Sequence, residues 1–226
     1  MTSRGREGFA PAPLRIWSNN VRGLNLPERR SHLLRALWSN RISVAFIQET
    51  HFPGQTGPAL RDRRFPTGYF ANHREAKKAG VAILFAAHVP FVCAEIKADP
   101  LGRYIFLKGS IADRRYTFAS IYAPNTRQHS FLTRTLKSLE HFREGLLILT
   151  GDLNIPDGHL PGTVLAAGRK HQSGTIGTQN GWPCGLLESH APRGQGFYIL
   201  LPGAPRLQPL RLCLYCTRIP ESITKM

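Results

Sequence analysis

An aspartate and an asparagine, Asp152 and Asn154, directly follow the short apolar run 146–150 and are the residues best placed to do chemistry. A short apolar run bounded by turn residues is typical of a strand buried on both faces. Sheets of this kind bind their ligands at the carboxyl ends of their strands. A carboxylate and an amide at such a position can bind a hard cation or a phosphate. Turn and helix-capping roles are the commoner explanation for this pair alone, so other segments must decide.

Three other predicted strand ends also carry polar side chains, namely Asn20, Gln48 with Glu49, and Tyr122 with Asn125. Magnesium binds carboxylate and amide oxygens, usually one or two carboxylates together with water. A phosphodiester under attack needs positive charge and hydrogen-bond donors at its oxygens and a positioned water. Each residue alone also has a structural explanation: a turn for Asn20, a surface charge for Glu49 and the core for Tyr122. Only the set as a whole indicates a catalytic centre.

The elements that would position these side chains alternate between strands and helices. The first two strands are expected at 14–20 and 42–47, and the helical spacing of apolar residues predicts a helix over 27–39 between them. This order predicts a crossover between strands of one sheet. A second helix is expected at 126–143, before the strand at 146–150. Five further short strands, consistent with hairpins, are expected at 69–71, 80–85, 89–96, 104–107 and 116–122.

The chain has 226 residues, with 30 Lys and Arg against 14 Asp and Glu, for a net charge of +16. Its length favours one domain, and its charge favours an anionic partner, nucleic acid first. No run approaches the roughly 20 apolar residues of a membrane span, and residues 1–13 look like a flexible leader without a secretory signal. We therefore expect an intracellular protein, with reduced cysteines, no membrane association and no obligate protein partner. Cys213 and Cys216 have zinc-ligand spacing, but no second pair accompanies them, so we expect no zinc site.

In this order, four segments resemble the endonuclease/exonuclease/phosphatase family, which includes exodeoxyribonuclease III, abasic-site endonucleases and deoxyribonuclease I. The matching segments are 18–24, 47–51, 121–125 and 149–154. Segment 102–109 looks most like the endonuclease domains of non-LTR retrotransposons. The resemblance covers residues 14–157. It implies an α/β fold, a four-layer α/β sandwich of the deoxyribonuclease I-like type, incomplete at its C-terminal end.

The resemblance also implies a role for each matching residue in a metal-dependent phosphodiesterase that acts on DNA. The metal would be Mg²⁺, with Mn²⁺ as an alternative. The implied roles are Glu49 as metal ligand, Asn20 holding the metal site, Tyr122 contacting the phosphate, Asp152 orienting or deprotonating the attacking water, Asn154 binding a phosphate oxygen and Asn125 supporting the site.

Candidate DNA contacts outside this set are the arginines Arg22, Arg61, Arg64 and Arg74. The aromatic residues Phe65, Tyr69 and Phe70 lie near three of them in sequence and could stack on bases. The competing explanation, which we favour for Tyr69 and Phe70, is ordinary packing in the core of a strand.

The segment 158–226 differs from the rest of the chain. From 159 on it holds 9 Gly and 7 Pro with only two acids, Glu188 and Glu221, and Asp157 is the last aspartate in the sequence. The family's Ser-Arg-Ile/Leu-Asp and Ser-Asp-His segments are missing, so we expect impaired catalysis, a poorly ordered tail and uncovered strand edges. We interpret the tail as read in a shifted frame or derived from an aberrant exon; a divergent second half is the alternative. The interpretation fails if neither other frame of the coding DNA encodes the two segments.

Three functions remain open at this point. The first is a magnesium-dependent nuclease of the retrotransposon or exodeoxyribonuclease III type, and the second is a catalytically inactive nucleic-acid-binding remnant of one. The third is a phosphatase of the same family, which the charge of the chain disfavours. A role on DNA implies a nuclear location.

Overall fold

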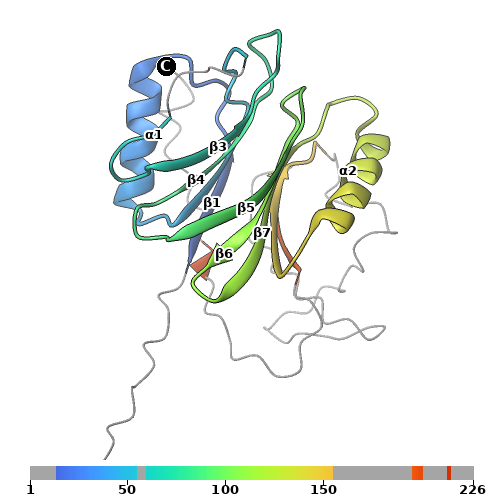
Figure 1. Ribbon diagram of the computed structural model, residues 1–226. Coiled ribbons are helices and arrows are strands. Elements are labelled where there is room, and N and C mark those ends of the chain that lie inside the picture. Colours follow the sequence, from blue (N-terminus) through green and yellow to red (C-terminus); the bar gives the residue numbers. More distant parts are fainter. Residues whose placement is uncertain (1–13, 55–59, 155–194, 201–212, 215–226) are drawn as a thin grey trace, which may run out of the picture.

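Two β-sheets pack face to face in the computed structural model, and one helix covers the outer side of each sheet (Figure 1). The structure describes residues 14–54, 60–154, 195–200 and 213–214. The order of layers, helix–sheet–sheet–helix, is the expected four-layer α/β sandwich. The predictions for residues 1–13 and for most of 158–226 lie outside the described residues.

The first sheet has the strand order β10-β1-β2-β4-β3. Its strands are β1 (Arg15–Asn20), β2 (Val44–Gln48), β3 (Thr67–Ala71), β4 (Val81–Phe85) and β10 (Cys213–Leu214). Strands β1 and β2 run parallel and are joined through α1 (Pro27–Ser39), so the expected crossover is confirmed. Strands β2, β4 and β3 pair antiparallel.

The second sheet has the strand order β5-β6-β7-β8-β9. Its strands are β5 (Phe91–Ala98), β6 (Tyr104–Ile111), β7 (Arg114–Tyr122), β8 (Leu146–Asp152) and β9 (Gln195–Leu200). Strands β5, β6 and β7 form an antiparallel meander, and β8 returns parallel to β7 after α2 (Gln128–Phe142). As expected for a strand covered on both faces, residues 146–151 of β8 are all buried.

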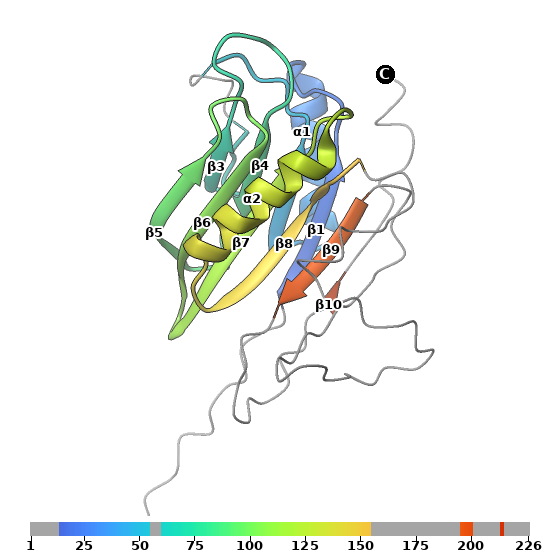
Figure 2. The same ribbon diagram turned by 90° about the vertical axis from the view of Figure 1, so that its right-hand side faces the viewer.

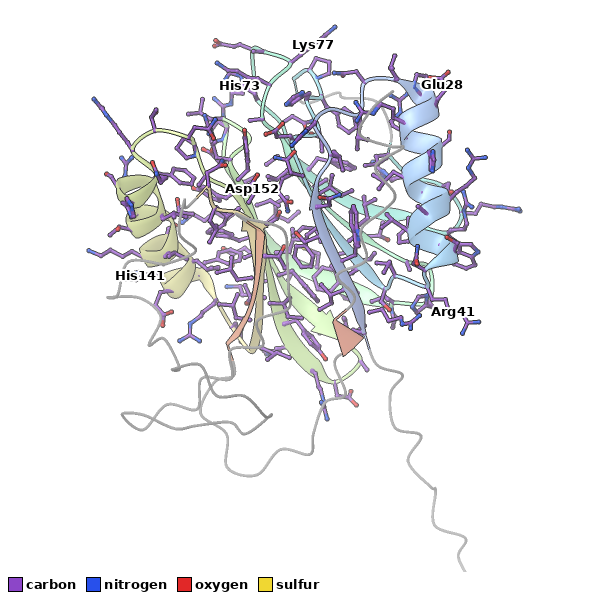
Figure 3. All side chains as sticks on the ribbon, turned by 180° about the vertical axis from the view of Figure 1, so that it is seen from behind. Glu28, Arg41, His73, Lys77, His141 and Asp152 are labelled. Carbon is purple, nitrogen blue, oxygen red and sulfur yellow. The ribbon has the colours of Figure 1, made fainter. Side chains whose placement is uncertain are left out.

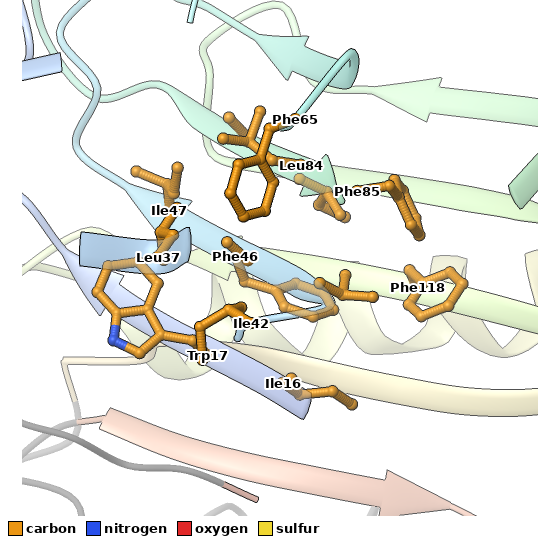
Figure 4. Close-up of a cluster of buried hydrophobic side chains, with 14 of the residues drawn as sticks. Ile16, Trp17, Leu37, Ile42, Phe46, Ile47, Phe65, Leu84, Phe85 and Phe118 are labelled. Carbon is orange, nitrogen blue, oxygen red and sulfur yellow. The ribbon is translucent and has the colours of Figure 1, made fainter. Parts of the chain in front are cut away.

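The main core lies between the two sheets and is rich in aromatic rings. Phe85 of the first sheet lies edge-on to Phe118 of the second, with ring centroids 5.1 Å apart, and Phe46 packs on the same ring (Figure 4). The helix α1 joins this core through Leu33, Leu34 and Leu37. A smaller cluster fills the space between α2 and the second sheet; it includes Phe106, Leu132, Leu136, Leu139 and Phe142. Full burial of each large apolar side chain contributes about 1.5–3 kcal/mol.

Strands β9 and β10 correct the expectation that the first half of the chain would have uncovered edges. Strand β9 pairs antiparallel with β8, and β10 pairs parallel with β1 (Figure 2). No strand was expected at Gln195–Leu200, whereas β10 lies inside 207–215, the only part of the tail with some strand character. These pairings depend on backbone hydrogen bonds to distant strands, which a search for local periodicity cannot detect.

Candidate active site

The predicted site residues gather at the end of the sandwich where β1, β2, β7 and β8 finish. In the register of the first sheet Asn20 pairs with Gln48, and in the second Tyr122 pairs with Asp152. Asp152 lies at the end of β8, between the two helix-covered sides of the molecule (Figure 3). The site therefore takes side chains from both sheets, and only the packing of the sheets brings them together.

One amide group holds the two key carboxylates next to each other. The Nδ2 of Asn20 donates to Oε1 of Glu49 at 2.8 Å and to Oδ2 of Asp152 at 2.9 Å. The Oδ1 of Asn20 accepts from the backbone N–H of Arg22 at 3.1 Å, which fixes the direction of the amide. A residue of the first sheet thus positions a carboxylate of the second, 132 positions along the chain.

The carboxyl group of Asp152 has a raised pKa, chiefly because it is buried. The hydrogen bonds from Asn20 and from the backbone N–H of Asn154 lower this pKa, the charge of Glu49 raises it, and the charge of Arg22 lowers it. The net effect is a carboxylate that binds a proton more strongly than an exposed aspartate does. That property suits a general base.

The phenol of Tyr122 remains protonated, because burial and a hydrogen bond to Glu49 raise its pKa well above the ordinary value. The negative charges of Glu49 and Asp152 act in the same direction, and the charge of Arg103 opposes them. The guanidinium carbon of Arg103 lies 5.5 Å from the centroid of the tyrosine ring. A neutral phenol in this place can donate a hydrogen bond to an oxyanion.

The backbone at these strand ends adopts conformations that non-glycine residues rarely use. Left-handed φ values of 50° to 56° occur at Arg22, Glu49, His51 and Asn154. Each costs about 1 kcal/mol or more, and such strain concentrates at functional sites. At Gly151 a Cβ would stand 1.9 Å from the carbonyl oxygen of Ile121, so only glycine lets β8 approach β7 here.

A buried polar network connects the two sheets beneath the site. The Nε2 of Gln48 donates to Oγ of Ser18 at 3.1 Å and to Oγ of Ser120 at 3.2 Å, while Oγ1 of Thr150 donates to Ser18 at 3.2 Å. All four residues are buried, and they come from β1, β2, β7 and β8. Because buried polar groups require partners, this network fixes how the strand ends face each other.

The carboxylates of Glu49 and Asp152 fit a hard divalent cation. Magnesium binds one or two carboxylates and keeps several waters, so it needs no larger protein cage. Within the described ranges no group of three or more His, Cys, Asp or Glu side chains is placed to hold a metal ion, so a cation here would rely on these two carboxylates and water. The sequence contains one CxxC pair, Cys213 and Cys216, and Cys216 lies outside the described residues.

The remaining predicted residues differ in how they relate to this cluster. Asn154 joins it: its Nδ2 donates to the carbonyl oxygen of Ala123 at 2.7 Å and its N–H to Asp152 at 3.2 Å. Asn125 is exposed in the loop after β7 and makes no hydrogen bond within the part of the chain that the structure describes. Its supporting role stays a prediction.

The four candidate arginines lie in three different places. Arg22 lies at the site, and Arg74 is exposed in the loop after β3, with its carbonyl near Gly54. Arg61 and Arg64 line a hollow beside α1, and Arg64 forms an ion pair with Asp62. Arg61 and Arg64 do not lie with the candidate catalytic residues.

The aromatic residues next to these arginines belong to the core. Phe65 is fully buried, so it cannot stack on a base as we had considered. Tyr69 packs edge-on against Phe85 and Phe91 with centroids 6.1 Å away, and Phe70 packs on Phe52. The core explanation for Tyr69 and Phe70 is confirmed.

Sequence reasoning assigned no role to two residues of the cluster. The Nε2 of His51 lies 3.4 Å from Oε2 of Glu49 and forms an ion pair when protonated. Arg103 contacts Tyr122 twice, through the ring and through its carbonyl oxygen, which accepts from the N–H of Tyr122 at 2.7 Å. Both residues belong to quoted motifs, so membership of the motifs was the available signal.

Comparison with known proteins agrees with this geometry. A sequence model described as the Endonuclease/Exonuclease/phosphatase family matches residues 16–207, well past the last of the four motifs. The "Transposon TX1 uncharacterized 149 kDa protein" of Xenopus laevis is 31% identical over 150 residues, which are 62% of this chain and 11% of that protein. The chain thus spans about a tenth of that relative's length.

Two solved structures share the fold. A humanized D. rerio TDP2 with 14 mutations is 20% identical, with a TM-score of 0.56 over 85% of each chain. A truncated Caenorhabditis elegans TDP2 is 15% identical, with a TM-score of 0.50 over 77% of this chain and 78% of that one.

None of the described helices is long and apolar enough to cross a membrane. The extent of the family match, together with the strand-end motifs, shows that the chain belongs to the endonuclease/exonuclease/phosphatase family.

Proposed function

We propose that the chain is a divalent-metal-dependent phosphodiesterase that cleaves DNA, of the retrotransposon nicking or exodeoxyribonuclease III-like type. The observation that carries this proposal is the pair of carboxylates held by one amide, Glu49 and Asp152 about Asn20, at the end of both sheets. The two carboxyl groups lie in different surroundings within one cluster. Such a pair can take two different roles, in which one carboxylate binds the metal and the other transfers a proton.

Glu49 would hold the cation, with Asn20 fixing the direction of its carboxylate. When bound, Mg²⁺ would neutralise charge on the phosphate oxygens and on the leaving oxygen. Mn²⁺ fits the same oxygen donors. The contact of His51 Nε2 with Oε2 of Glu49, at 3.4 Å, would keep the second oxygen of Glu49 in place.

Asp152 would orient the attacking water and accept its proton. Its buried position and raised pKa make it a stronger base than an exposed carboxylate. The neutral phenol of Tyr122 would turn its single O–H from Glu49 to a phosphate oxygen as negative charge develops there, and the second N–H of the Asn154 amide would donate to another phosphate oxygen. Asn125, in the loop just after Tyr122, would support this arrangement.

The net charge of +16 supports a polymeric anion as substrate over a small phosphate ester. The transposon protein among the relatives points in the same direction, because transposition acts on DNA. A nuclear location would follow from this role.

A second candidate function is a nucleic-acid-binding remnant that no longer cleaves. The observation that favours it is the absence of any aspartate after Asp157, which leaves the family's terminal Ser-Asp-His segment without a counterpart. Loss of such a pair lowers cleavage by orders of magnitude and leaves binding by the basic surface in place.

Nicking of supercoiled plasmid by the purified chain tests the proposal. We expect nicking with Mg²⁺, none with EDTA, and a loss of at least about 100-fold in the Glu49→Gln variant. Asp113→Asn is the matched control, since Asp113 is exposed in the turn between β6 and β7, at the other end of the sandwich. Circular dichroism would establish that both variants fold.

Nicking that survives EDTA, or that Glu49→Gln leaves intact, would refute the assignment of this site. A folded chain that binds DNA in a salt-dependent way without nicking it would establish the remnant instead.

A further inference from the structure

A hollow of about 420 Å³ lies next to the catalytic cluster, between the β5–β6 hairpin and the start of α2. None of the roles proposed above uses it, although Arg103, Tyr104 and Pro124 of its lining lie in segments that resemble the family. Its lining consists of Asp99, Leu101, Arg103, Tyr104, Pro124, Thr126, Arg127, Phe131, Arg134, Thr135 and Ser138.

Arg103 connects this hollow to the catalytic residues. Its guanidinium lies over the ring of Tyr122, and the tyrosine in turn makes its hydrogen bond to Glu49. The opposite wall follows directly from β7, because Pro124 and Thr126 come just after Tyr122 in the chain. Arg103 and the loop after β7 therefore connect Tyr122, the proposed phosphate contact, to the lining of the hollow.

The lining combines positive charge with exposed apolar surface. Three arginines face a single acid, Asp99, whose Oδ2 already accepts from the backbone N–H of Arg103 at 3.0 Å. Leu101 is 55% exposed, and the partly buried rings of Tyr104 and Phe131 line the same space. Cations beside aromatic and apolar surface are the features that bind a single nucleotide, through its phosphate and the face of its base.

The loop that carries Arg103 is held rigidly. The N–H of Gly102 donates to the carbonyl of Asp99 at 2.9 Å, and the N–H of Gly80 donates to the carbonyl of Gly102 at 3.0 Å. A Cβ at Gly102 would stand 2.9 Å from the backbone nitrogens of Gly80 and His73, so the loop packs tightly on the β3–β4 connection. Such pre-organisation lowers the entropic cost of binding.

We propose that this hollow binds an unpaired nucleotide next to the phosphate that the catalytic cluster holds. The inference rests on the proposed action on DNA and specifies which DNA is preferred. A paired base cannot present its face to Leu101 and Phe131, because its neighbours in the duplex cover it. The chain should therefore prefer DNA with unpaired nucleotides at the cleavage position, such as a bubble or a frayed end.

Fluorescence anisotropy with the full chain in EDTA tests this preference without requiring cleavage. The probes are a labelled duplex and the same duplex with a short run of mismatched thymines. We expect the wild type to bind the bubble about tenfold more tightly, and a Leu101→Ser/Phe131→Ala variant to lose most of this preference. Val92→Ser is the control, since Val92 is 67% exposed on β5, outside the hollow, and should retain the preference.

Leu101→Ser alone keeps the test decisive if the double variant fails to fold, because Leu101 is exposed; we expect it to reduce the preference about threefold. Equal binding of both probes by the wild type, or an unchanged preference in Leu101→Ser, overturns the inference. Plasmid nicking separates the two proposals. If the chain prefers the bubble but does not nick the plasmid, the nucleotide-binding hollow is supported and the proposed cleavage activity is refuted. If the chain nicks the plasmid but shows no preference for the bubble, the cleavage activity is supported and the nucleotide-binding hollow is refuted.

Discussion

Two basic hollows lie on opposite sides of the sandwich, one beside each outer helix, and they carry the same surplus of two positive charges. The hollow beside α1, of about 610 Å³, has four arginines against Glu28 and Asp62. The hollow beside α2, of about 420 Å³, has three arginines against Asp99. Net charge alone would rank them equally as surfaces for nucleic acid.

The surroundings of the arginines distinguish the two hollows. Beside α1, Arg64 is paired with Asp62, and Arg30 donates to the carbonyl oxygens of Leu24 and Asn25. That hollow has no aromatic residue in its lining. Beside α2, Arg103 instead contacts Tyr122, and aromatic surface is available. The two hollows therefore differ in aromatic surface and in the contact of Arg103 with Tyr122, and not in net charge.

The largest expected effect separates cleavage from binding at the α2 hollow. Asp152→Asn should reduce plasmid nicking by at least about 100-fold, because the amide cannot accept a proton from water. Affinity for DNA in EDTA should stay within about twofold, since the hollow does not use this carboxylate. Nicking assays and anisotropy on the same preparation measure both. If the variant nicks normally, Asp152 is not the base.

An effect of intermediate size is expected on the salt dependence of DNA binding. It is tested by replacing one exposed arginine from each helix, Arg134 on α2 and Arg35 on α1. Arg134→Ala should lower the slope of log affinity against log salt by about 0.9, the value for one lost phosphate contact. Arg35→Ala should leave the slope unchanged. Anisotropy titrations over a range of salt concentrations measure both slopes. Equal changes of the slope in the two variants would show that DNA affinity depends on the total charge of the chain and not on which hollow the arginine lines.

The smallest effect concerns Asp62, in the hollow beside α1. Burial would raise the pKa of this carboxyl group, but hydrogen bonds from the Arg64 side chain and from the backbone N–H groups of Phe65 and Arg64, together with the charge of Arg64, hold the pKa below its ordinary value. Because the pKa of Asp62 is lower in the folded state than in the unfolded state, its carboxylate stabilises the protein at any pH above the unfolded-state pKa. This contribution disappears as the pH falls through the folded-state pKa.

Asp62→Asn should therefore reduce the free energy of unfolding at neutral pH by less than about 1 kcal/mol. The difference from wild type should shrink below about pH 4. Urea denaturation over a pH series measures it. The variant should bind DNA as the wild type does; a change in DNA affinity would bring the α1 hollow into the binding surface.

The fold was predictable where local pattern and burial agree. Strand β8 was recognisable because four consecutive apolar residues, 146–149, precede its polar end, and α1 because Leu33, Leu34 and Leu37 share one face. Strand β6 extends four residues past its expected end, to Ile111. Gly109 interrupts the apolar pattern there, yet both neighbouring strands continue the ladder, and a Cβ at this glycine would stand 2.2 Å from the carbonyl oxygen of Val92.

The sequence by itself determined the family and the types of residue at the strand ends, because the motifs are local and a strand places its last side chains at one edge of its sheet. Only the tertiary structure decided which of these side chains meet. The two hydrogen bonds of Asn20 join carboxylates from different sheets, and Arg103 reaches Tyr122 from a neighbouring hairpin. These contacts depend on how the two sheets pack and how the strands align, which no spacing within one segment records.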